Sequence, residues 1–387
     1  MNNKFEKSAT CRFLTAFLVA GAAASLGGCT SSSSSSSSQT NASGNGTVAA
    51  QEWSVDHANW SELGFEWQWT GFPPVQPGAT IDHATAFEDV LVFMGSGSTL
   101  SVLETNTGKV RWSRQIDRPS TRFQESVRRG ETLFTASDTE LWELNLRNGN
   151  TIDRDSLGTL VNTSPLIVDN LAIFGTLSGE LFAWQMNNDF KLWSYRFDGP
   201  IHVPAISVNT EFIAAISEKG DIRTLETINA HSGISVRIAG GSEADLLTDE
   251  IGLYIASKDQ SIYAFDIEDG FRFWRKRSSA PITVQHTLHE GVIYATTDDN
   301  GISAIDSATG ENIWNNDSVG GWAITVVDGN ELIVWSGFEL LAIDKDRGDI
   351  ITRMPLRDIA GIRTDSINDG DLYVITLEGT VAKFSLK

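Results

Sequence analysis

The sequence predicts an all-β fold, an eight-bladed β-propeller closed by an N-terminal strand. One phrase recurs along the 387 residues: apolar-x-Ala-apolar-Asp-x-x-x-Gly-x-x-x-Trp, which is clearest at 262–274 and 302–314. Its copies follow one another every 38–41 residues, and each copy carries the turn and strand signals of four short strands. Four antiparallel strands repeated at about 40 residues are typical of propeller blades.

The alanine of the phrase serves as a marker for each copy. The eight marker positions are Val102, Glu143, Ala183, Thr224, Ala264, Ala304, Ala342 and Ala382. Consecutive markers lie 41, 40, 41, 40, 40, 38 and 40 residues apart. A period this regular indicates one unit stacked on itself. We therefore expect residues 53–387 to form a single eight-bladed propeller.

The copy between 283 and 315 shows the four expected strands. Residues 292–297 alternate apolar and polar side chains, as a half-buried strand does. Asn300-Gly301 follows this run and is a strong hairpin signal. The complete copy therefore has predicted strands at 283–288, 292–297, 302–305 and 311–315.

The two ends of the repeat array predict how the ring closes. The last copy ends at Lys387, before a fourth strand can form. An isolated strand, 65–69, stands near the start, and its Trp69 precedes Trp112 by 43 residues, about one repeat. We therefore expect 65–69 to pair with the last copy. A closed ring leaves few strand edges exposed.

The repeated Gly, Asp and Trp are interpreted as architecture and not as an active site. Glycine permits a positive φ in the tight turn, aspartate bonds the backbone of that turn, and tryptophan can pack over it and bridge neighbouring blades. The predicted turn residues are Gly108, Gly149, Gly233, Gly270, Gly310 and Gly348, with Asp266, Asp306 and Asp344 as capping aspartates. The Trp position is occupied in order by Trp112, Asp153, Trp193, Arg237, Trp274, Trp314 and Thr352.

The N-terminal residues predict export and a lipid anchor. A basic start precedes a short apolar run, 13–24, and the small-residue sequence Leu-Gly-Gly-Cys follows at 26–29. The run is too short for a membrane span, which needs about 20 apolar residues. The pattern describes a signal peptide, and its end resembles a bacterial lipobox. We predict a lipoprotein signal peptide at 1–28 and lipidation of Cys29.

Residues 29–52 are predicted to form a flexible linker between that anchor and the propeller. They include eight consecutive serines, Ser31 to Ser38, and offer nothing for a core. At about 5–6 Å × √n, twenty such residues place the folded domain about 25 Å from the bilayer. The linker therefore lets the domain search its surroundings while the lipid holds it at the membrane.

Composition excludes several functional classes. Asp and Glu number 50 against 29 Lys and Arg, and a net charge of −21 argues against a nucleic-acid partner. Two cysteines are too few for a disulfide scaffold, a zinc ribbon or an iron–sulfur cluster. His286 and His289 lie three apart on a predicted strand and so face opposite sides, which predicts solvated or turn histidines and no metal site. No catalytic arrangement stands out, so we expect no enzyme activity.

The repeat phrase resembles that of PQQ-like, quinoprotein-type propellers over roughly residues 60–387. The dehydrogenases among these proteins carry adjacent cysteines over the quinone, a calcium ion and a catalytic aspartate. No cysteine follows Cys29 here. The resemblance therefore implies the fold, and the missing cysteines imply that the chain binds no PQQ and no other cofactor.

A narrower resemblance is to the BamB family, carried by the lipoprotein N-terminus, the eight copies and the terminal stretch 370–382. It implies a lipid-anchored protein at the periplasmic face of the outer membrane, and Thr30, where an Asp would resemble an inner-membrane retention signal, agrees with that. It further implies a scaffold that binds the periplasmic domain of a BamA-type subunit and its complex, and so assists the assembly and insertion of β-barrel proteins.

The same resemblance indicates candidate partner-binding residues. The loop that corresponds to the family's Arg-containing contact loop is 198–204, which contains His202 and no arginine, and the next loop, 241–245, keeps its acidic character. The exposed arginine pair in a predicted hairpin turn is a separate candidate. The predicted partner-binding residues are therefore His202, Glu243, Asp245, Arg128 and Arg129.

Two alternatives remain open. The chain could be an envelope lipoprotein that binds a polysaccharide or another ligand, and Trp322 and Trp335, which lie off the repeat Trp position, are then the residues of interest. It could also be a degenerate quinoprotein enzyme, which absorbance of the purified protein would reveal.

Overall fold

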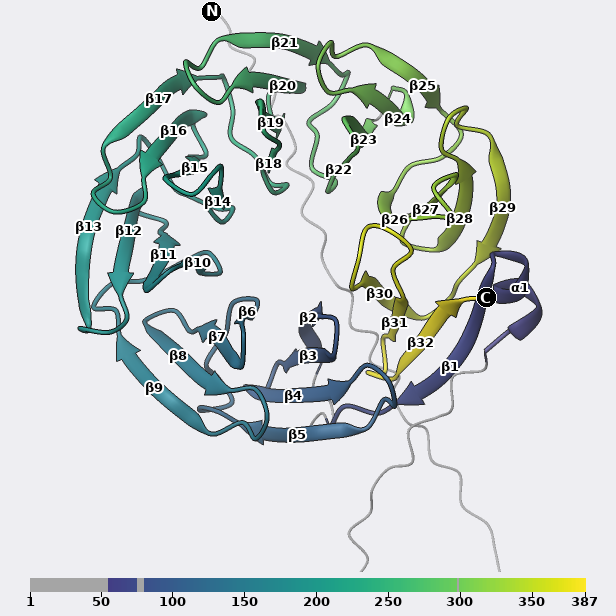
Figure 1. Ribbon diagram of the computed structural model, residues 1–387, viewed down its shortest axis with the longest axis horizontal. Helices are drawn as coiled ribbons and strands as arrows, with labels where there is room; N and C mark the ends of the chain where they lie inside the picture. The colour runs from purple at the N-terminus through teal and green to yellow at the C-terminus, as the bar shows by residue number, and fades with distance from the viewer. Residues whose placement is uncertain (1–54, 75–79, 298) are drawn as a thin grey trace, which may run out of the picture. The chain divides into compact units, whose positions relative to one another are not determined.

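The computed structural model describes residues 55–74, 80–297 and 299–387. These residues form eight four-stranded antiparallel sheets and one short helix, α1 (His57–Glu62). The sheets are arranged in a ring around a central opening (Figure 1). The prediction of an all-β, eight-bladed propeller is therefore confirmed. The signal peptide, Cys29 and the linker up to residue 54 lie outside the described residues.

Each sheet is one blade, with its first strand innermost and its fourth at the rim (Figure 1). For blades 1 to 8 in order, the first strands are β2 (Ile81–Ala86), β6 (Val127–Arg129), β10 (Leu166–Val168), β14 (Ile206–Ser207), β18 (Leu247–Thr248), β22 (Thr287–His289), β26 (Trp322–Val327) and β30 (Ile359–Thr364). The second strands are β3 (Val90–Gly95), β7 (Thr132–Ala136), β11 (Leu171–Gly175), β15 (Phe212–Ile216), β19 (Gly252–Ser257), β23 (Val292–Thr297), β27 (Glu331–Trp335) and β31 (Leu372–Thr376).

The third strands carry the repeat markers. They are β4 (Thr99–Glu104), β8 (Glu140–Asn145), β12 (Glu180–Gln185), β16 (Asp221–Glu226), β20 (Ser261–Asp266), β24 (Gly301–Asp306), β28 (Glu339–Asp344) and β32 (Val381–Leu386). The fourth strands are β5 (Val110–Gln115), β9 (Thr151–Ser156), β13 (Phe190–Arg196), β17 (Ser232–Arg237), β21 (Arg272–Arg277), β25 (Asn312–Asn316), β29 (Ile350–Pro355) and β1 (Phe65–Gly71).

Blade 8 is built from both ends of the described chain. β1 pairs antiparallel with β32 from Phe65 opposite Leu386 to Gly71 opposite Val381. Helix α1 precedes β1, and its Trp60 stacks on Phe384 of β32 with ring centroids 3.5 Å apart. No helix in the described part of the chain has the length and apolar character needed to cross a membrane.

The hydrophobic core lies between the blades and not within them. In the described residues, eight clusters of buried apolar side chains each join two neighbouring sheets. One cluster brings Tyr294 and Trp314 of blade 6 against Leu332 and Leu341 of blade 7. A single blade would expose both of its apolar faces, so every blade depends on its two neighbours.

Tryptophans of the fourth strands connect consecutive blades, as the repeat predicted. Each inter-blade tryptophan donates its indole N–H to a carbonyl oxygen three residues past the marker of the next blade, at 2.6–2.8 Å. The donor and acceptor pairs are Trp69 with Thr105, Trp112 with Leu146, Trp193 with Thr227, Trp274 with Ser307, and Trp314 with Lys345. Each bond joins two sheets at the turn between the third and fourth strands.

Glycine is required beneath four of these indoles. A Cβ on Gly310 would lie 2.5 Å from the Trp274 ring, and one on Gly348 would lie 2.4 Å from the Trp314 ring. Both glycines have a positive φ, as do the turn residues six places past the marker in the other copies that have this turn. The aspartate before the turn accepts backbone N–H bonds, as Asp306 does from Thr309 at 2.8 Å.

Blade 4 departs from the predicted register of its turn. Gly233 was predicted at the positive-φ turn position, but it lies in β17, and Ala230 has the positive φ of 58°. Arg237 was predicted at the Trp position, but Ile234 occupies that position. The Ile234 N–H donates to Thr224 Oγ1 at 2.8 Å, and the Ile234 side chain covers Gly270. The two assignments were wrong because they were counted from Gly233 and not from the marker.

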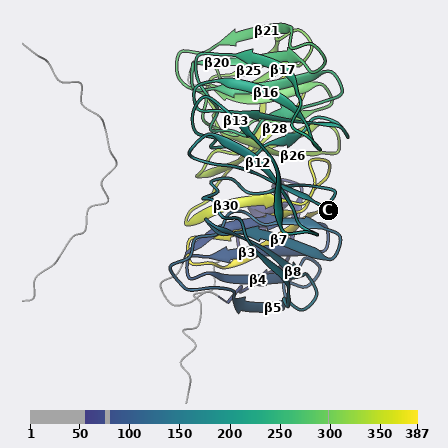
Figure 2. The same cartoon turned by 90° about the vertical axis from the view of Figure 1, so that its left-hand side faces the viewer.

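The ring has two loop faces. Antiparallel strands alternate in direction, so the connections between blades and the turns between second and third strands lie at one end of each blade (Figure 2). We call this end the entry-loop face; it includes 197–205 and 217–220. The opposite end, the Trp-turn face, carries the turns between first and second and between third and fourth strands, such as 249–251 and 267–271.

We expect Gly310→Ala to lower the free energy of unfolding by more than the strain of a positive φ alone would. Gly329→Ala is the matched control, because Gly329 has a similar φ of 68° but no heavy atom within 4 Å of an added Cβ. We expect the control to cost about 1 kcal/mol and Gly310→Ala about 2 kcal/mol more, because its Cβ overlaps Trp274. Urea unfolding measures both. Equal losses would mean that the Trp274 contact tolerates a side chain.

Candidate functional site

The structure places the predicted partner-binding residues on opposite faces of the ring. His202, Glu243 and Asp245 lie in the connections that enter blades 4 and 5, which belong to the entry-loop face. Arg128 and Arg129 end β6 at its turn to β7, which belongs to the Trp-turn face. The two groups therefore cannot form one interface.

Backbone hydrogen bonds hold the loops around His202 and Glu243 together. Glu218 N–H donates to Pro200 O at 2.7 Å, Gly241 N–H donates to Glu218 O at 2.8 Å, and Lys258 N–H donates to Gly241 O at 2.9 Å. The chain of bonds alternates between connections and hairpin turns of blades 3, 4 and 5. The loops therefore form one continuous, preorganised surface.

Ion pairs cover this surface. Lys258 Nζ lies 2.8 Å from Glu243, and His202 Nε2 lies 3.5 Å from Glu218. The hydrogen bond from Lys258 to Glu243 raises the pKa of Lys258, and the charge of Glu218 adds to the rise. We call this surface the entry-loop patch; its residues are Asp198, His202, Glu218, Lys219, Arg237, Glu243 and Lys258.

Asp198 brings basic side chains to the loop that has no arginine of its own. Arg237 from β17 donates to one carboxylate oxygen of Asp198 at 2.8 Å, and Lys219 donates to the other at 2.9 Å. These two hydrogen bonds hold the pKa of Asp198 below its usual value. Neither Arg237 nor Lys219 was among the partner-binding residues predicted from the sequence. When the copy is counted from the marker Thr224, the Trp position falls on Ile234, and Arg237 is then a candidate surface residue.

Asp245 lies at the inner side of the same connection as Glu243. Its side chain accepts a hydrogen bond from Gln285 at 3.2 Å, and Gln285 in turn accepts the Asp245 N–H at 3.1 Å. Surrounding protein raises the pKa of Asp245, and the charge of Glu125 raises it further. Glu125 lies in the connection that enters blade 2, which also belongs to the entry-loop face. Through Gln285, Asp245 joins blade 5 to blade 6.

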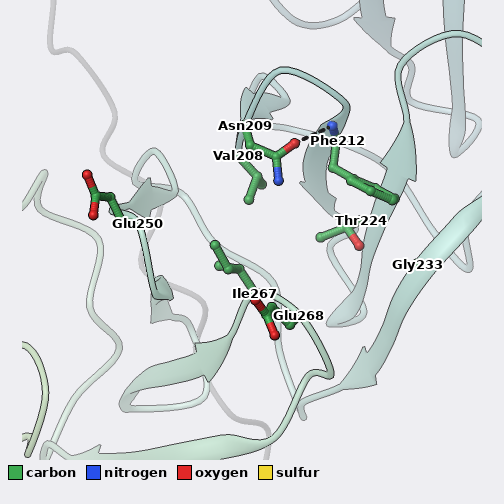
Figure 3. Close-up of a pocket in the computed structure, with 8 residues that line it drawn as sticks. All are labelled: Val208, Asn209, Phe212, Thr224, Gly233, Glu250, Ile267 and Glu268. Carbon is green, nitrogen blue, oxygen red and sulfur yellow. Dashed lines mark hydrogen bonds between the residues drawn. The ribbon is translucent and has the colours of Figure 1, made fainter.

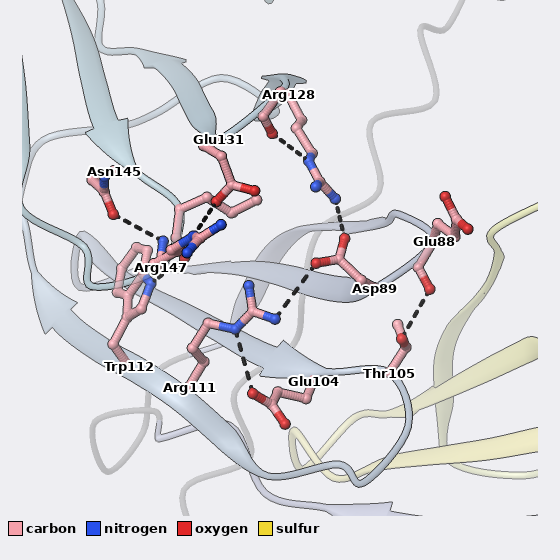
Figure 4. Close-up of polar contacts among 12 residues, drawn as sticks. Glu88, Asp89, Glu104, Thr105, Arg111, Trp112, Arg128, Glu131, Asn145 and Arg147 are labelled. Atoms are coloured by element: carbon pink, nitrogen blue, oxygen red, sulfur yellow. Dashed lines mark hydrogen bonds and ion pairs between the residues drawn. The ribbon is translucent and has the colours of Figure 1, made fainter.

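Arg128 is engaged within the fold (Figure 4). Its guanidinium pairs with Asp89 of the neighbouring blade, and its Nε donates to Gly130 O at 2.8 Å. Burial alone would raise the pKa of Asp89, but the hydrogen bond and charge of Arg128, together with Arg111, lower it. Arg128 thus ties blade 1 to blade 2, and Arg129 is the exposed member of the pair.

Three carboxylates meet at the interface between blades 2 and 3. Asp153, Asp155 and Asp189 bring one oxygen each within 4.8 Å of the others. Burial and the charges of Asp153 and Asp155 raise the pKa of the adjacent Glu143, and Trp184 donates to Asp155 at 2.9 Å. The cluster stands where the repeat would place a tryptophan. Burial raises the pKa of Asp155, and the charges of Asp189 and Asp153 raise it further.

The sequence model of the family described as outer membrane protein assembly factor BamB matches residues 44–254 and 258–385 of this chain. The chain belongs to the BamB family. The predicted family resemblance is therefore confirmed. A search of curated proteins found no match.

Solved structures share the fold of the BamB-family chain at low sequence identity. BamB from Moraxella catarrhalis is 16% identical with a TM-score of 0.65, covering 80% of this chain and 99% of that one. Quinohemoprotein alcohol dehydrogenase from Comamonas testosteroni is 12% identical with a TM-score of 0.64, covering 86% and 78%. At these identities the likeness shows the propeller fold alone.

The two tryptophans of the ligand-binding alternative lie side by side in the BamB-family chain. Trp322 of β26 and Trp335 of β27 are paired across the sheet, and both line a cavity of about 530 Å³ beside Phe338 on the entry-loop face. Trp322 donates its indole N–H to Thr287 Oγ1 at 3.1 Å, which joins blade 7 to blade 6. One of the two indoles therefore has a structural role.

The two histidines of the His-x-x-His sequence are buried, contrary to the expectation of solvated residues. His289 is 6% exposed and hydrogen-bonds Asn368 at 2.5 Å. His286 is 4% exposed, and neither of its ring nitrogens has a hydrogen-bond partner in the described part of the chain. Burial lowers the pKa of His286 to about 4. The prediction assumed a strand over 283–288, but β22 begins at Thr287, so His286 lies in the connection before it and strand alternation does not determine its exposure.

We expect His286 to make the BamB-family propeller acid-sensitive. The unfolded chain binds a proton on this histidine below about pH 6.5 and the folded chain only below about pH 4, so stability falls as pH decreases between these values. The contribution is about 2 kcal/mol from pH 7 to pH 5. In His286→Leu, the free energy of unfolding measured by urea denaturation should therefore fall by about 2 kcal/mol less between pH 7 and pH 5.

The exposed His231 provides the control, because His231→Leu also removes one histidine. The comparison isolates His286, since the proteins share every other titrating group. An unchanged pH dependence in His286→Leu would contradict the assignment.

Proposed function

We propose that this chain is a non-catalytic scaffold lipoprotein that assists the assembly and insertion of β-barrel proteins into the outer membrane. It does so by binding the periplasmic domain of a BamA-type subunit. The family match over residues 44–254 and 258–385 is the observation that carries the proposal. Propellers serve as rigid docking platforms, and nothing in this role requires a cofactor. The quinoprotein alternative lacks the paired cysteines, because no cysteine follows Cys29.

The entry-loop patch is the proposed docking surface. Its loops are preorganised by backbone bonds, so binding orders little new structure. Its charges alternate in sign, with Glu243 beside Lys258 and Asp198 between Lys219 and Arg237. A partner with the complementary alternation would gain orientation and association rate more than affinity. Asp245 extends the surface toward the central opening.

The predicted lipid anchor makes a weak interface sufficient. A shared membrane and a linker of about twenty residues raise the effective concentration of the propeller around any partner in the same membrane. Contacts on the entry-loop patch then select the partner, while the anchor at Cys29 supplies proximity. The protein therefore acts from the periplasmic face of the outer membrane.

We expect Glu243→Arg/Asp245→Arg to weaken capture of the BamA-type subunit at least tenfold. The change reverses the acidic loop and breaks the Lys258 ion pair, but it leaves every inter-blade tryptophan in place. The measurement is mild crosslinking of the tagged full-length protein in its own cells, followed by quantification of co-purified barrel-assembly subunits. The free energy of unfolding is measured in parallel.

Glu311→Arg/Asp349→Arg is the matched control. Both carboxylates are exposed on the Trp-turn face and make no ion pair in the described residues. It should capture the subunit as the unchanged protein does. Undiminished capture by the Glu243/Asp245 variant would place the interface elsewhere, and absence of any barrel-assembly subunit from the unchanged protein would overturn the proposed function.

We expect Cys29→Ser to release the protein from the membrane. The thioether-linked lipid would be missing while the propeller, which begins beyond the linker, would fold as before. Detergent-phase partitioning and sucrose-gradient fractionation of the membranes measure the effect, with Ser31→Ala in the neighbouring linker as the control. Membrane association that survives in Cys29→Ser would contradict the predicted anchor.

A further inference from the structure

The interface between blades 4 and 5 lacks two aromatic residues that fill other interfaces. In blades 5 and 6 the marker alanine lies between a tyrosine and a tryptophan, with ring centroids 6.3 Å apart for Tyr254 and Trp274. The structurally equivalent positions in blade 4 are Ala214 and Ile234. Both replacements are smaller than the aromatic side chains.

A cavity of about 550 Å³ opens at this interface (Figure 3). Phe212, Thr224 and Gly233 of blade 4 line one side, and Glu250 and Ile267 of blade 5 line the other. The cavity is thus a consequence of the sequence departure in blade 4. Ile234 and Val236 pack against Gly270, where an inter-blade tryptophan would lie, and the cavity lies beside them.

The hydrogen-bond acceptor for an indole is still present in this cavity. Ile267 lies three residues past the marker Ala264, the position whose carbonyl oxygen accepts the indole N–H in five other interfaces. No donor among the described residues reaches Ile267 O. A carbonyl at this position can therefore accept a hydrogen bond from an indole that another molecule brings.

Two other interfaces that lack the tryptophan are filled from elsewhere in the chain. Between blades 2 and 3, Trp184 reaches back and donates to Asp155. Between blades 7 and 8, Trp60 of α1 packs in the cluster that contains Met354 and Leu356. No tryptophan lines the cavity between blades 4 and 5. That interface therefore has room for a side chain from another molecule.

The rim of the cavity is acidic and apolar. Glu250 and Glu268 are exposed and make no ion pair in the described part of the chain. Ile228, Ile251 and Phe271, on turns of the same face, are 75%, 65% and 66% exposed. Unpaired carboxylates beside exposed apolar side chains favour a partner that is both basic and apolar.

We propose that this cavity binds a polypeptide segment that presents a tryptophan next to lysine or arginine. The indole enters the cavity beside Ile234 and donates its N–H to Ile267 O, the carbonyl equivalent to the one that accepts the chain's own indoles elsewhere. The neighbouring lysine or arginine of the segment pairs with Glu250 and Glu268. The exposed Ile251 and Phe271 contact the apolar parts of the segment on either side of its tryptophan. The site lies on the Trp-turn face, so it can be occupied together with the entry-loop patch.

The proposal is tested on the full-length protein with two fluorescein-labelled, end-blocked peptides, Gly-Lys-Trp-Lys-Gly and Gly-Lys-Ala-Lys-Gly. Fluorescence anisotropy measures the dissociation constants at low salt. We expect the tryptophan peptide to bind at least tenfold more tightly than the alanine peptide. Ile234→Trp places the repeat's own residue at this interface. It should weaken binding of the tryptophan peptide at least tenfold and raise the thermal unfolding midpoint of the protein.

Glu250→Arg/Glu268→Arg is a second variant that leaves the cavity open, and it should also weaken binding at least tenfold. Glu311→Arg/Asp349→Arg, the control on the same face, should bind as the unchanged protein does. Equal affinity for the two peptides would overturn the proposal. So would full binding by Ile234→Trp. Both results leave the proposed docking at the entry-loop patch untouched, because that is measured by capture of the barrel-assembly subunit.

Discussion

The tryptophan that crosses from one blade to the turn of the next is the contact on which the rest of the propeller depends. The apolar clusters lie between sheets, so the ring is stable only if neighbouring blades meet in a fixed register. The indole N–H of Trp274 or Trp314 fixes that register through one carbonyl bond, and the glycine beneath it permits the close approach. Because blade 8 is completed by β1, the same dependence runs through both chain ends.

Because the inter-blade indole bonds lie at the Trp-turn face, the entry-loop face is available for binding a partner. The indole bonds lie at the Trp-turn end, and at the entry-loop face backbone hydrogen bonds such as Glu218 N–H to Pro200 O join the loops, so the exposed side-chain charges there contribute little to closure. Arg128 illustrates the contrast, since its pairing with Asp89 makes it part of the connection between blades 1 and 2. Glu243 and Lys258 instead pair at the surface, where an exposed ion pair contributes at most about 1 kcal/mol to stability. A partner can exchange such pairs at little cost to the fold.

The repeat arithmetic predicted the blades, the third-strand markers and the tryptophan contacts, because each depends on spacing within the sequence. It also predicted 65–69 beside the last copy, where β1 lies. It could not place Arg237 on Asp198, because that contact joins the last strand of blade 4 to the connection that enters this blade, 39 residues earlier in the sequence. It likewise missed the burial of His286, because this residue lies in the connection before β22 and not in the predicted strand. Spacing predicts what a repeat shares, and tertiary packing determines where copies differ.

The interfaces that lack the inter-blade tryptophan differ in whether another side chain of the same chain fills the space. A lost tryptophan leaves a packing defect, and evolution of the same chain can fill such a defect from any nearby element. Trp184 and Trp60 show this at two interfaces. At the interface of blades 4 and 5, Ile234 replaces the tryptophan, Ala214 stands where blades 5 and 6 have a tyrosine, and no donor among the described residues bonds Ile267 O. A cavity at an interface between blades lowers the stability of the chain, and a partner's indole that filled it would recover part of that loss.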